Sequence, residues 1–287
     1  MSPIEEKPLV SVIIPCYNHE KYIEECLRSV MSQTYNNLQI IVIDDGSQDQ
    51  SFEIAQKVLT YGNSIVVKQS NIGLPRTINR ALKEFATGSF IVILASDDWL
   101  DSTSIEKQVN CFQLNNNLGF VFGKAMVVGA NGKYLYEIPS LKRRRQITFN
   151  ELLKENFVPA LATMIKKSAL YDVGLYDINS KIEDWDMWLR LGLKYEFQFI
   201  DELLGFYRQH PNQTSTKYDL IDDSEIYILN KHQHLPIYKE AYNTHLLRSI
   251  RNRLPAGKKK ACLMLMKNIF LINKREYWSL VFKLLIS

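Results

Sequence analysis

Cysteine is scarce in this chain and follows no pattern. The 287 residues include four cysteines, Cys16, Cys26, Cys111 and Cys262, with no Cys-x-x-Cys pair. A zinc ribbon or a disulfide framework needs cysteines at regular spacing, so we expect neither. The scarcity fits a reducing, cytoplasmic compartment.

Long apolar runs are also missing. No uninterrupted apolar stretch approaches the roughly 18 residues that a membrane-spanning helix needs. Residues 1–7 are acidic and lack the basic start and long apolar region of a signal peptide. These absences predict a protein that is soluble or that lies on a membrane without crossing it.

Strong charge and several familiar catalytic signatures are absent too. The net charge of +4 is too small to predict a nucleic-acid partner without a patterned basic face. The sequence has no Gly-x-Gly-x-x-Gly fingerprint, no P-loop and no recognisable Ser-His-Asp or Cys-His arrangement. We therefore expect neither a P-loop enzyme nor a covalent nucleophile of these kinds.

What is present is an ordinary globular composition, 46% hydrophobic and 23% charged, with enough apolar residues for one large α/β core. In the first hundred residues, short apolar runs alternate with amphipathic segments, which is typical of a parallel sheet with helical crossovers. The pattern predicts strands over residues 9–14, 39–43, 64–67 and 90–94, and helices around 22–31, 52–59 and 78–85.

Three of the expected strands stop on polar residues. In chain order these are Tyr17-Asn18, Asp44-Asp45 and Asp97-Asp98. Parallel strands end at one edge of their sheet, where ligands of such folds bind, so we expect the three groups to converge there. Adjacent carboxylates repel each other, which points to a bound Mg²⁺ or Mn²⁺. The alternative is a surface turn that caps the next helix.

The second half predicts an antiparallel addition to the sheet. Residues 119–128 and 133–138 are strand-like and flank the hairpin signal Asn131-Gly132. The basic run at residues 142–145 is either a solvated loop or a contact for an anionic group.

A helix is expected around residues 182–191, where Glu183, Asp184 and Asp186 accompany two tryptophans. The acidic residues are either partners of the helix dipole or part of a site with an apolar wall and a general base. Farther on, Arg208 and His210 are spaced two apart in an extended segment, so both can point at a phosphate, although a lone histidine is more often structural.

The chain is expected to be helical from residue 219 onward. Its last thirty residues mix aliphatic and aromatic residues with seven cations against the single acid Glu276; the cations are Lys258, Lys259, Lys260, Lys267, Lys274, Arg275 and Lys283. This composition is typical of a helix in an anionic lipid interface. The alternative is a helical pair that packs on the domain or on a second subunit in a homo-oligomer.

Several segments of the chain, taken together, match the successive motifs of one enzyme family. They are residues 10–18, 32–35, 43–47, 71–73 and 96–98, followed by 183–190 and 207–210. In this order they resemble the motifs of family 2 glycosyltransferases with a GT-A fold. The resemblance covers about residues 9–215 and implies a mixed, mainly parallel α/β sheet flanked by helices. It implies a GT-A domain over 1–215, with a nucleotide-binding half (1–100) and an acceptor half (101–215). Residues 216–287 lie outside the resemblance and remain as a C-terminal helical extension, for which membrane association and packing on the domain or a second subunit both stay open.

The resemblance also assigns roles to residues. It implies that Pro15, Tyr17, Asn18 and Asp45 hold the nucleotide, that Asp97 lies on its ribose side, and that Asp98 and His210 bind the metal. It places Arg208 at the diphosphate and makes Asp184 the general base, which Glu183 or Asp186 positions or replaces. One departure is Ala95, where many members carry a further aspartate.

The function implied is inverting transfer of a sugar from a nucleotide-diphosphate sugar, a UDP-sugar, to a saccharide or lipid-linked saccharide. The setting would be polysaccharide or glycolipid synthesis at the inner face of the plasma membrane. One rival is a degenerate member that binds nucleotide-sugar without transfer, which Ala95 motivates. Another is a nucleotidyltransferase, which would normally carry a glycine-rich basic loop after the first strand; residues 15–20 have neither feature.

Overall fold

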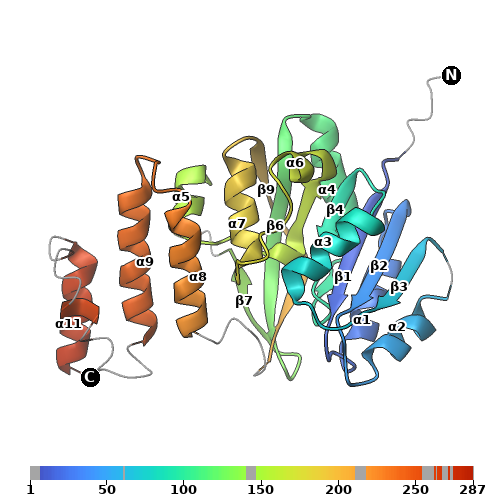
Figure 1. Cartoon of the computed structure of the whole chain (residues 1–287), viewed down its shortest axis with the longest axis horizontal. Coiled ribbons are helices and arrows are strands. Elements are labelled where there is room, and N and C mark those ends of the chain that lie inside the picture. The colour runs from blue at the N-terminus through green and yellow to red at the C-terminus, as the bar shows by residue number, and fades with distance from the viewer. Residues whose placement is uncertain are drawn as a thin grey trace. The chain divides into compact units, whose positions relative to one another are not determined.

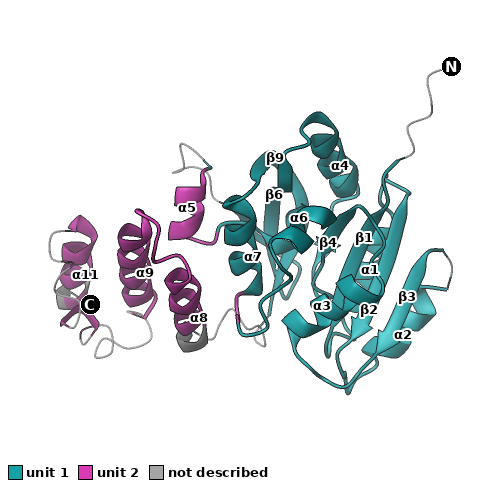
Figure 2. Ribbon diagram, turned by 45° about the horizontal axis from the view of Figure 1, so that its top comes forward, with its two compact units in different colours: residues 1–147, 157–179, 183–210 teal, residues 148–156, 180–182, 211–287 magenta. Residues whose placement is uncertain are grey.

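The computed structural model describes residues 7–60, 62–139, 147–210, 218–253, 262, 264–266, 271 and 274–286. The chain divides into two compact units (Figure 2). Unit 1 comprises residues 1–147, 157–179 and 183–210, and unit 2 comprises residues 148–156, 180–182 and 211–287. The basic run at 142–145 lies outside the described residues, as do Lys258, Lys259, Lys260 and Lys267.

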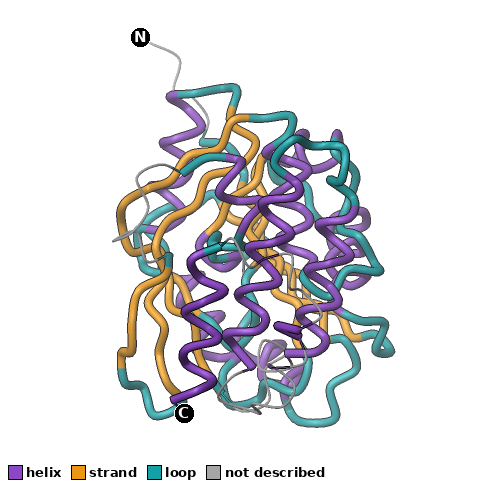
Figure 3. Tube along the Cα trace, turned by 90° about the vertical axis from the view of Figure 1, so that its left-hand side faces the viewer, coloured by secondary structure: helices purple, strands orange, loops and turns teal. Residues whose placement is uncertain are grey.

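Unit 1 is built on one mixed sheet (Figures 1 and 3). Its strands are β1 (Val10–Cys16), β2 (Leu38–Asp44), β3 (Ser64–Lys68), β4 (Phe90–Ile93), β5 (Trp99–Leu100), β6 (Leu118–Gly129), β7 (Tyr134–Ile138), β8 (Thr163–Lys166) and β9 (Glu196–Gln209). They lie in the order β3-β2-β1-β4-β8-β6-β9-β5, and β7 pairs with β6. Strands β1 to β4 are mutually parallel, while β8 runs antiparallel to β4 and β6. The predicted mainly parallel sheet with an antiparallel addition is confirmed.

Helices connect and cover these strands. In unit 1 they are α1 (Ile23–Met31), α2 (Ser51–Val58), α3 (Leu74–Glu84), α4 (Ser104–Leu114), α6 (Lys167–Asp172) and α7 (Glu183–Gly192). On one face of the sheet, alternate residues of β1 join α1 in the core; the cluster includes Val10, Val12, Ile14, Ile23 and Leu27. The intervening Ser11 and Ile13 are fully buried as well. Burial on both faces explains why this strand is a continuous apolar run.

Two strands differ from their sequence expectation. Proline lacks the N–H that a sheet ladder uses, so Pro15 is expected to close the first strand, but β1 continues to Cys16 and Pro15 pairs with Ile43 of β2. Since β4 pairs with β1 only as far as Ile13, the missing N–H of Pro15 lies beyond that ladder. The sequence also predicts a strand over residues 196–200, but that strand, β9, runs on to Gln209, with irregular register against β6. This extension carries Arg208 to the end of β4.

Unit 2 contains α5 (Phe149–Lys154), α8 (Tyr218–Asn230), α9 (Tyr238–Arg253) and α11 (Arg275–Ile286). Helix α11 packs on α9 through an apolar cluster that includes Leu246, Ile250, Tyr277 and Leu280. Within the described part of the chain, no helix combines the length and the apolar character needed to cross a bilayer.

Candidate active site

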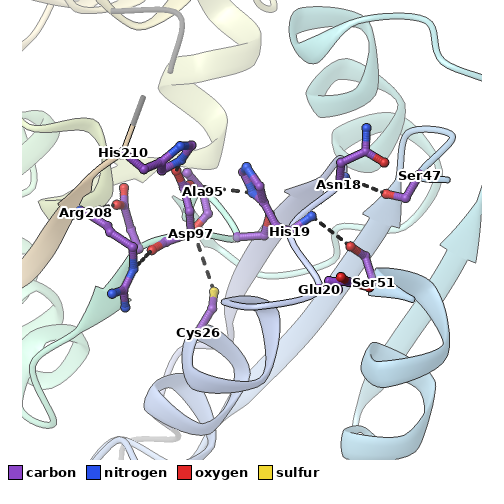
Figure 4. A network of polar contacts seen from close by, with 12 residues as sticks. Asn18, His19, Glu20, Cys26, Ser47, Ser51, Ala95, Asp97, Arg208 and His210 are labelled. Atoms are coloured by element: carbon purple, nitrogen blue, oxygen red, sulfur yellow. Dashed lines mark hydrogen bonds and ion pairs between the residues drawn. The ribbon is translucent and has the colours of Figure 1, made fainter. Parts of the chain in front are cut away.

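The loops that follow β1 and β2 are tied together at the carboxyl edge of the sheet (Figure 4). The backbone N–H of Asn18 donates to Ser47 Oγ at 2.9 Å, and that of His19 donates to Ser51 Oγ at 2.8 Å. Asn18 has a left-handed backbone (φ 56°), which asparagine adopts more readily than most residues, and its Oδ1 accepts the N–H of Gln48. Asn18 thus joins the two loops, and its contact with a nucleotide stays a prediction.

Pro15 and Tyr17 bracket the end of β1. Pro15 is buried in the strand, whereas Tyr17 is 48% exposed. An exposed aromatic ring can stack on a nucleotide base, because every base has a π-face. The position of Tyr17 suits its predicted role.

The carboxylates that end β2 hold two turns. Asp44 is fully buried and accepts the N–H of Ser47 at 2.9 Å. Asp45 accepts the N–H groups of Ile72 and Gly73, both at 2.9 Å, and the side-chain amide of Gln69 at 2.7 Å. Asp45 therefore fixes the Asn-Ile-Gly loop at the sheet edge, so a nucleotide bound to Asp45 would lie beside that loop.

The adjacent aspartates after β4 have different surroundings. Asp98 is 3% exposed, and one of its oxygens accepts the backbone N–H of Arg208 at 2.9 Å. Burial, followed by the charge of Asp97, holds the pKa of Asp98 well above its usual range. Asp97 is also buried, but its oxygens meet two imidazoles: His210 Nε2 lies 3.0 Å from Oδ2, and His19 Nδ1 lies 3.8 Å from Oδ1. Asp97 thus faces both His210, which the sequence predicted for the site, and His19, which it did not. Asp98 is turned towards β9 instead.

His19 was not among the residues expected from the sequence. Figure 4 shows its ring beside Asp97, across from His210, and its Nδ1 lies 2.7 Å from Ser96 Oγ. Burial lowers the pKa of His19, although the charge of Asp97 opposes that effect. The ring is therefore favoured in its neutral form, which is the form that binds metals. The only feature of the sequence that could have pointed to His19 is its position directly after Tyr17-Asn18.

The guanidinium of Arg208 holds the aspartate loop, residues 94–98, which joins β4 to β5. It lies over the rings of Tyr22 (4.9 Å) and Trp99 (4.5 Å), its Nε donates to the carbonyl of Asp97 at 3.0 Å, and its Nη2 donates to Glu25 at 2.5 Å. The side chain is only 9% exposed, and Figure 4 shows the guanidinium pointing away from His210. This arrangement joins α1, β9 and the aspartate loop. The role of Arg208 at a diphosphate remains a prediction.

The acidic start of α7 places two carboxylates side by side. Burial, and then the charge of Asp184, raise the pKa of Glu183 to about 8. Asp184 accepts the backbone N–H of Trp185 at 2.7 Å. Burial, and then the charges of the same two carboxylates, raise the pKa of Tyr176, so that tyrosine lies near them. The raised pKa of Glu183 favours its protonated form near neutral pH, beside the carboxyl group of Asp184.

Asp186 lies in a different setting. It is fully buried and accepts Arg190 Nε at 2.9 Å. Arg190 also donates to the backbone carbonyls of Val173, Gly174 and Leu175. Asp186 thus anchors the segment that leads to α7, which matches a supporting role better than that of a base.

The residues present fit a divalent metal at the sheet edge. His19, Asp97 and His210 each offer one ligand atom, and these atoms lie within 4.8 Å of one another. Among the described residues, a second such group, Asp222, Glu225 and His245, lies in unit 2. There the arginines of α9 already pair with the carboxylates, because Arg248 contacts Glu225 and Arg253 contacts Asp222. The sheet-edge group is therefore the better candidate.

The profile of the family described as glycosyl transferase family 2 matches residues 11–174, more than half of the chain. The chain belongs to this family. An uncharacterized glycosyltransferase of Rickettsia bellii is 31% identical over 220 residues, which are 73% of this chain and 31% of that protein. The UDP-Glc:alpha-D-GlcNAc-diphosphoundecaprenol beta-1,3-glucosyltransferase WfgD of Escherichia coli is 32% identical over 189 residues, 64% of this chain and 69% of that one. The chain spans about a third of the length of the Rickettsia bellii and Rickettsia felis relatives.

Solved structures share the fold. Staphylococcus aureus TarS 1–349 in complex with UDP-GlcNAc has a TM-score of 0.66 at 20% identity, covering 82% of this chain and 72% of that one. Mannosyltransferase PcManGT of Pyrobaculum calidifontis in complex with GDP-Man and Mn²⁺ has a TM-score of 0.67 at 17% identity, covering 98% and 85%. At these identities the likeness establishes the GT-A fold, as the sequence predicted.

The Arg208 clamp generates a stability prediction. Glu25→Gln removes the charge that faces a nearly buried guanidinium, so we expect the free energy of unfolding to fall by roughly 1–2 kcal/mol, less than for a fully buried pair because Glu25 is 55% exposed. The matched control is Glu24→Gln, which breaks the exposed pair with Arg28 and should cost no more than about 0.5 kcal/mol. Urea denaturation measures both, and equal losses would contradict the clamp.

Proposed function

We propose that this chain is an inverting glycosyltransferase that moves a sugar from a nucleotide-diphosphate sugar, a UDP-sugar, to an acceptor hydroxyl. The observation that carries the proposal is the convergence of Asp97, His19 and His210 at the carboxyl edge of the sheet, beside the exposed Tyr17. Family membership and the GT-A fold support the same reaction class. The donors in the names of WfgD and TarS support UDP, whereas PcManGT binds GDP-Man.

The donor would lie across the loops after β1, β2 and β4. Tyr17 would stack on the base, while Asp45, with Pro15 and Asn18 nearby, would hold the nucleoside. A divalent ion, Mn²⁺ or Mg²⁺, held by Asp97 or Asp98 with His210, would offset the charge that develops on the departing diphosphate. Arg208 would add positive charge near this leaving group, through the clamp that it forms with the aspartate loop.

The acceptor would be activated at the start of α7. In this proposal Asp184 accepts a proton from the acceptor hydroxyl, whose oxygen attacks the anomeric carbon from the side opposite the diphosphate. One displacement inverts the configuration and needs no covalent intermediate. Glu183, protonated at neutral pH, would donate a hydrogen bond and leave the negative charge on its neighbour.

The physiological setting follows from the relatives. The E. coli relative is named for a diphosphoundecaprenol acceptor, and a Bacillus subtilis relative for teichuronic acid biosynthesis. We infer assembly of a cell-envelope polysaccharide or glycolipid, on a saccharide or lipid-linked saccharide acceptor.

The choice of base can be tested by two substitutions at α7. Asp184→Asn should lower kcat by about 10²–10⁴-fold, because it removes the proton acceptor, with the affinity for the donor unchanged. Glu183→Gln imitates the protonated form of Glu183, so it should cost less than tenfold at pH 7. Hydrolysis or transfer is followed with UDP-Glc, UDP-GlcNAc and GDP-Man, and donor affinity by calorimetry.

The outcomes separate the rivals. If Glu183→Gln loses as much activity as Asp184→Asn, the assignment of the base is wrong. If the wild-type chain binds a donor but neither transfers nor hydrolyses it above background, the chain is a degenerate binding member of the family.

The same proposal places the enzyme on the anionic inner face of the plasma membrane through α11. One side of this helix packs on α9, but Trp278 is 54% and Phe282 is 61% exposed, one turn apart. Lys274 and Arg275 are exposed beside them. Aromatic side chains combined with basic charge are what an anionic lipid interface binds.

Vesicle binding tests this placement. The double substitution Trp278→Ser and Phe282→Ser should weaken partition onto phosphatidylglycerol vesicles by at least about tenfold, because two aromatic side chains no longer enter the interface. The control is Tyr134→Ser with Tyr136→Ser, equally exposed rings on β7, which should bind like the wild type. If sedimentation instead shows a lipid-free dimer that the α11 substitutions dissociate, a second copy covers this face and the membrane placement is wrong.

A further inference from the structure

His19 lies in a position that the proposed reaction does not explain. It is partly buried, and it comes from the loop after β1, whereas Asp97 and His210 come from the segments after β4 and β9. The two imidazole rings meet edge to face, with centroids 5.8 Å apart, and the ligand atoms of all three residues lie within 4.8 Å. Three segments distant in sequence thus bring three metal-binding groups to one point (Figure 4).

The loop holds His19 in this place firmly. Its backbone N–H is bonded to Ser51 Oγ, and the preceding residue, Asn18, adopts the left-handed backbone that turns the chain. Its ring is also in edge contact with Tyr22, at 6.0 Å between centroids. A side chain positioned by its own backbone needs little reordering to bind an ion.

The nitrogen-rich composition of the group has a chemical consequence. Mg²⁺ prefers an octahedral set of oxygen ligands, whereas Mn²⁺, a transition ion that also takes oxygen ligands, accepts an imidazole nitrogen more readily than Mg²⁺ does. Two imidazoles and one carboxylate on one side of an ion leave its remaining positions open, which suits a metal that also takes oxygens of a diphosphate. Asp98, turned to the backbone of β9, does not supply a second carboxylate to this group in the structure.

We propose that His19 is a metal ligand and that, with Asp97 and His210, it makes a two-imidazole, one-carboxylate site that selects Mn²⁺ over Mg²⁺. The inference rests on the proposed function for the diphosphate that completes the coordination, but the ion and its protein ligands can be tested without any donor. It also names Asp97 rather than Asp98 as the ligating carboxylate.

The alternative is that His19 is held only by its hydrogen bond to Ser96 Oγ, at 2.7 Å, and supports the loop. That contact involves Nδ1, the same atom that lies 3.8 Å from Asp97 Oδ1. A structural histidine would leave Mn²⁺ binding unchanged when it is replaced by a side chain that keeps a hydrogen bond. Glutamine meets that condition and removes the imidazole nitrogen from the group.

The experiment titrates the full chain with Mn²⁺ and, separately, with Mg²⁺, using calorimetry and the electron paramagnetic resonance signal of free Mn²⁺. The wild type should bind Mn²⁺ at least tenfold more tightly than Mg²⁺. His19→Gln should weaken Mn²⁺ binding at least tenfold and change Mg²⁺ binding by less than threefold. The control is His234→Gln, an exposed imidazole in unit 2, which should change neither.

A second readout counts nitrogens directly and does not require the variant to fold. Electron spin echo modulation of Mn²⁺ on the wild-type chain should show two imidazole nitrogens. One nitrogen, or Mn²⁺ affinity unchanged in a folded His19→Gln, overturns the inference. Failure of the proposed function looks different, because a two-nitrogen Mn²⁺ site would then coexist with no hydrolysis or transfer from any donor.

Discussion

The repulsion between two neighbouring carboxylates is the constraint on which the site depends. Asp97 and Asp98, which follow β4, are both buried, and two adjacent negative charges are costly in a buried position. The protein relieves this cost in two directions. The backbone N–H and guanidinium of Arg208 hold one side of the loop, and two imidazoles face the other side. Burial, and then the charge of Asp97, still hold the pKa of Asp98 well above its usual range.

The sheet makes this arrangement possible. Parallel β1, β2 and β4 deliver three loops to one edge, and the long β9 brings Arg208 and His210 to the same edge from the other half of unit 1. Backbone N–H groups that donate to the side-chain oxygens of Asn18 and Asp45 then fix the loops relative to one another. Each of these loops is thus anchored by hydrogen bonds to backbone or side-chain groups.

The sheet, the hairpin and the convergence of the strand ends could be predicted from the sequence, because alternation of apolar runs with amphipathic segments is a local pattern. The roles of His19 and Glu25 in the site could not. Both are ordinary residues in their local context, and only pairing between distant segments gives them partners. The full length of β9 could not be predicted for a similar reason. Its second half is a strand because it pairs with β6 and β5, and no apolar run marks it in the sequence. Which of two adjacent aspartates faces the histidines depends on side-chain direction, which spacing does not determine.

The central claim is that the polar groups at the carboxyl edge of the sheet form a nucleotide-sugar site. The most direct measurement is calorimetric titration of UDP, GDP and their sugar derivatives into the purified chain, with and without Mn²⁺. The account predicts that one nucleotide class binds, that Mn²⁺ strengthens the binding, and that Asp97→Asn abolishes this metal effect while the protein stays folded. Absence of binding by every nucleotide-sugar, from a chain whose unfolding curve is intact, would contradict it.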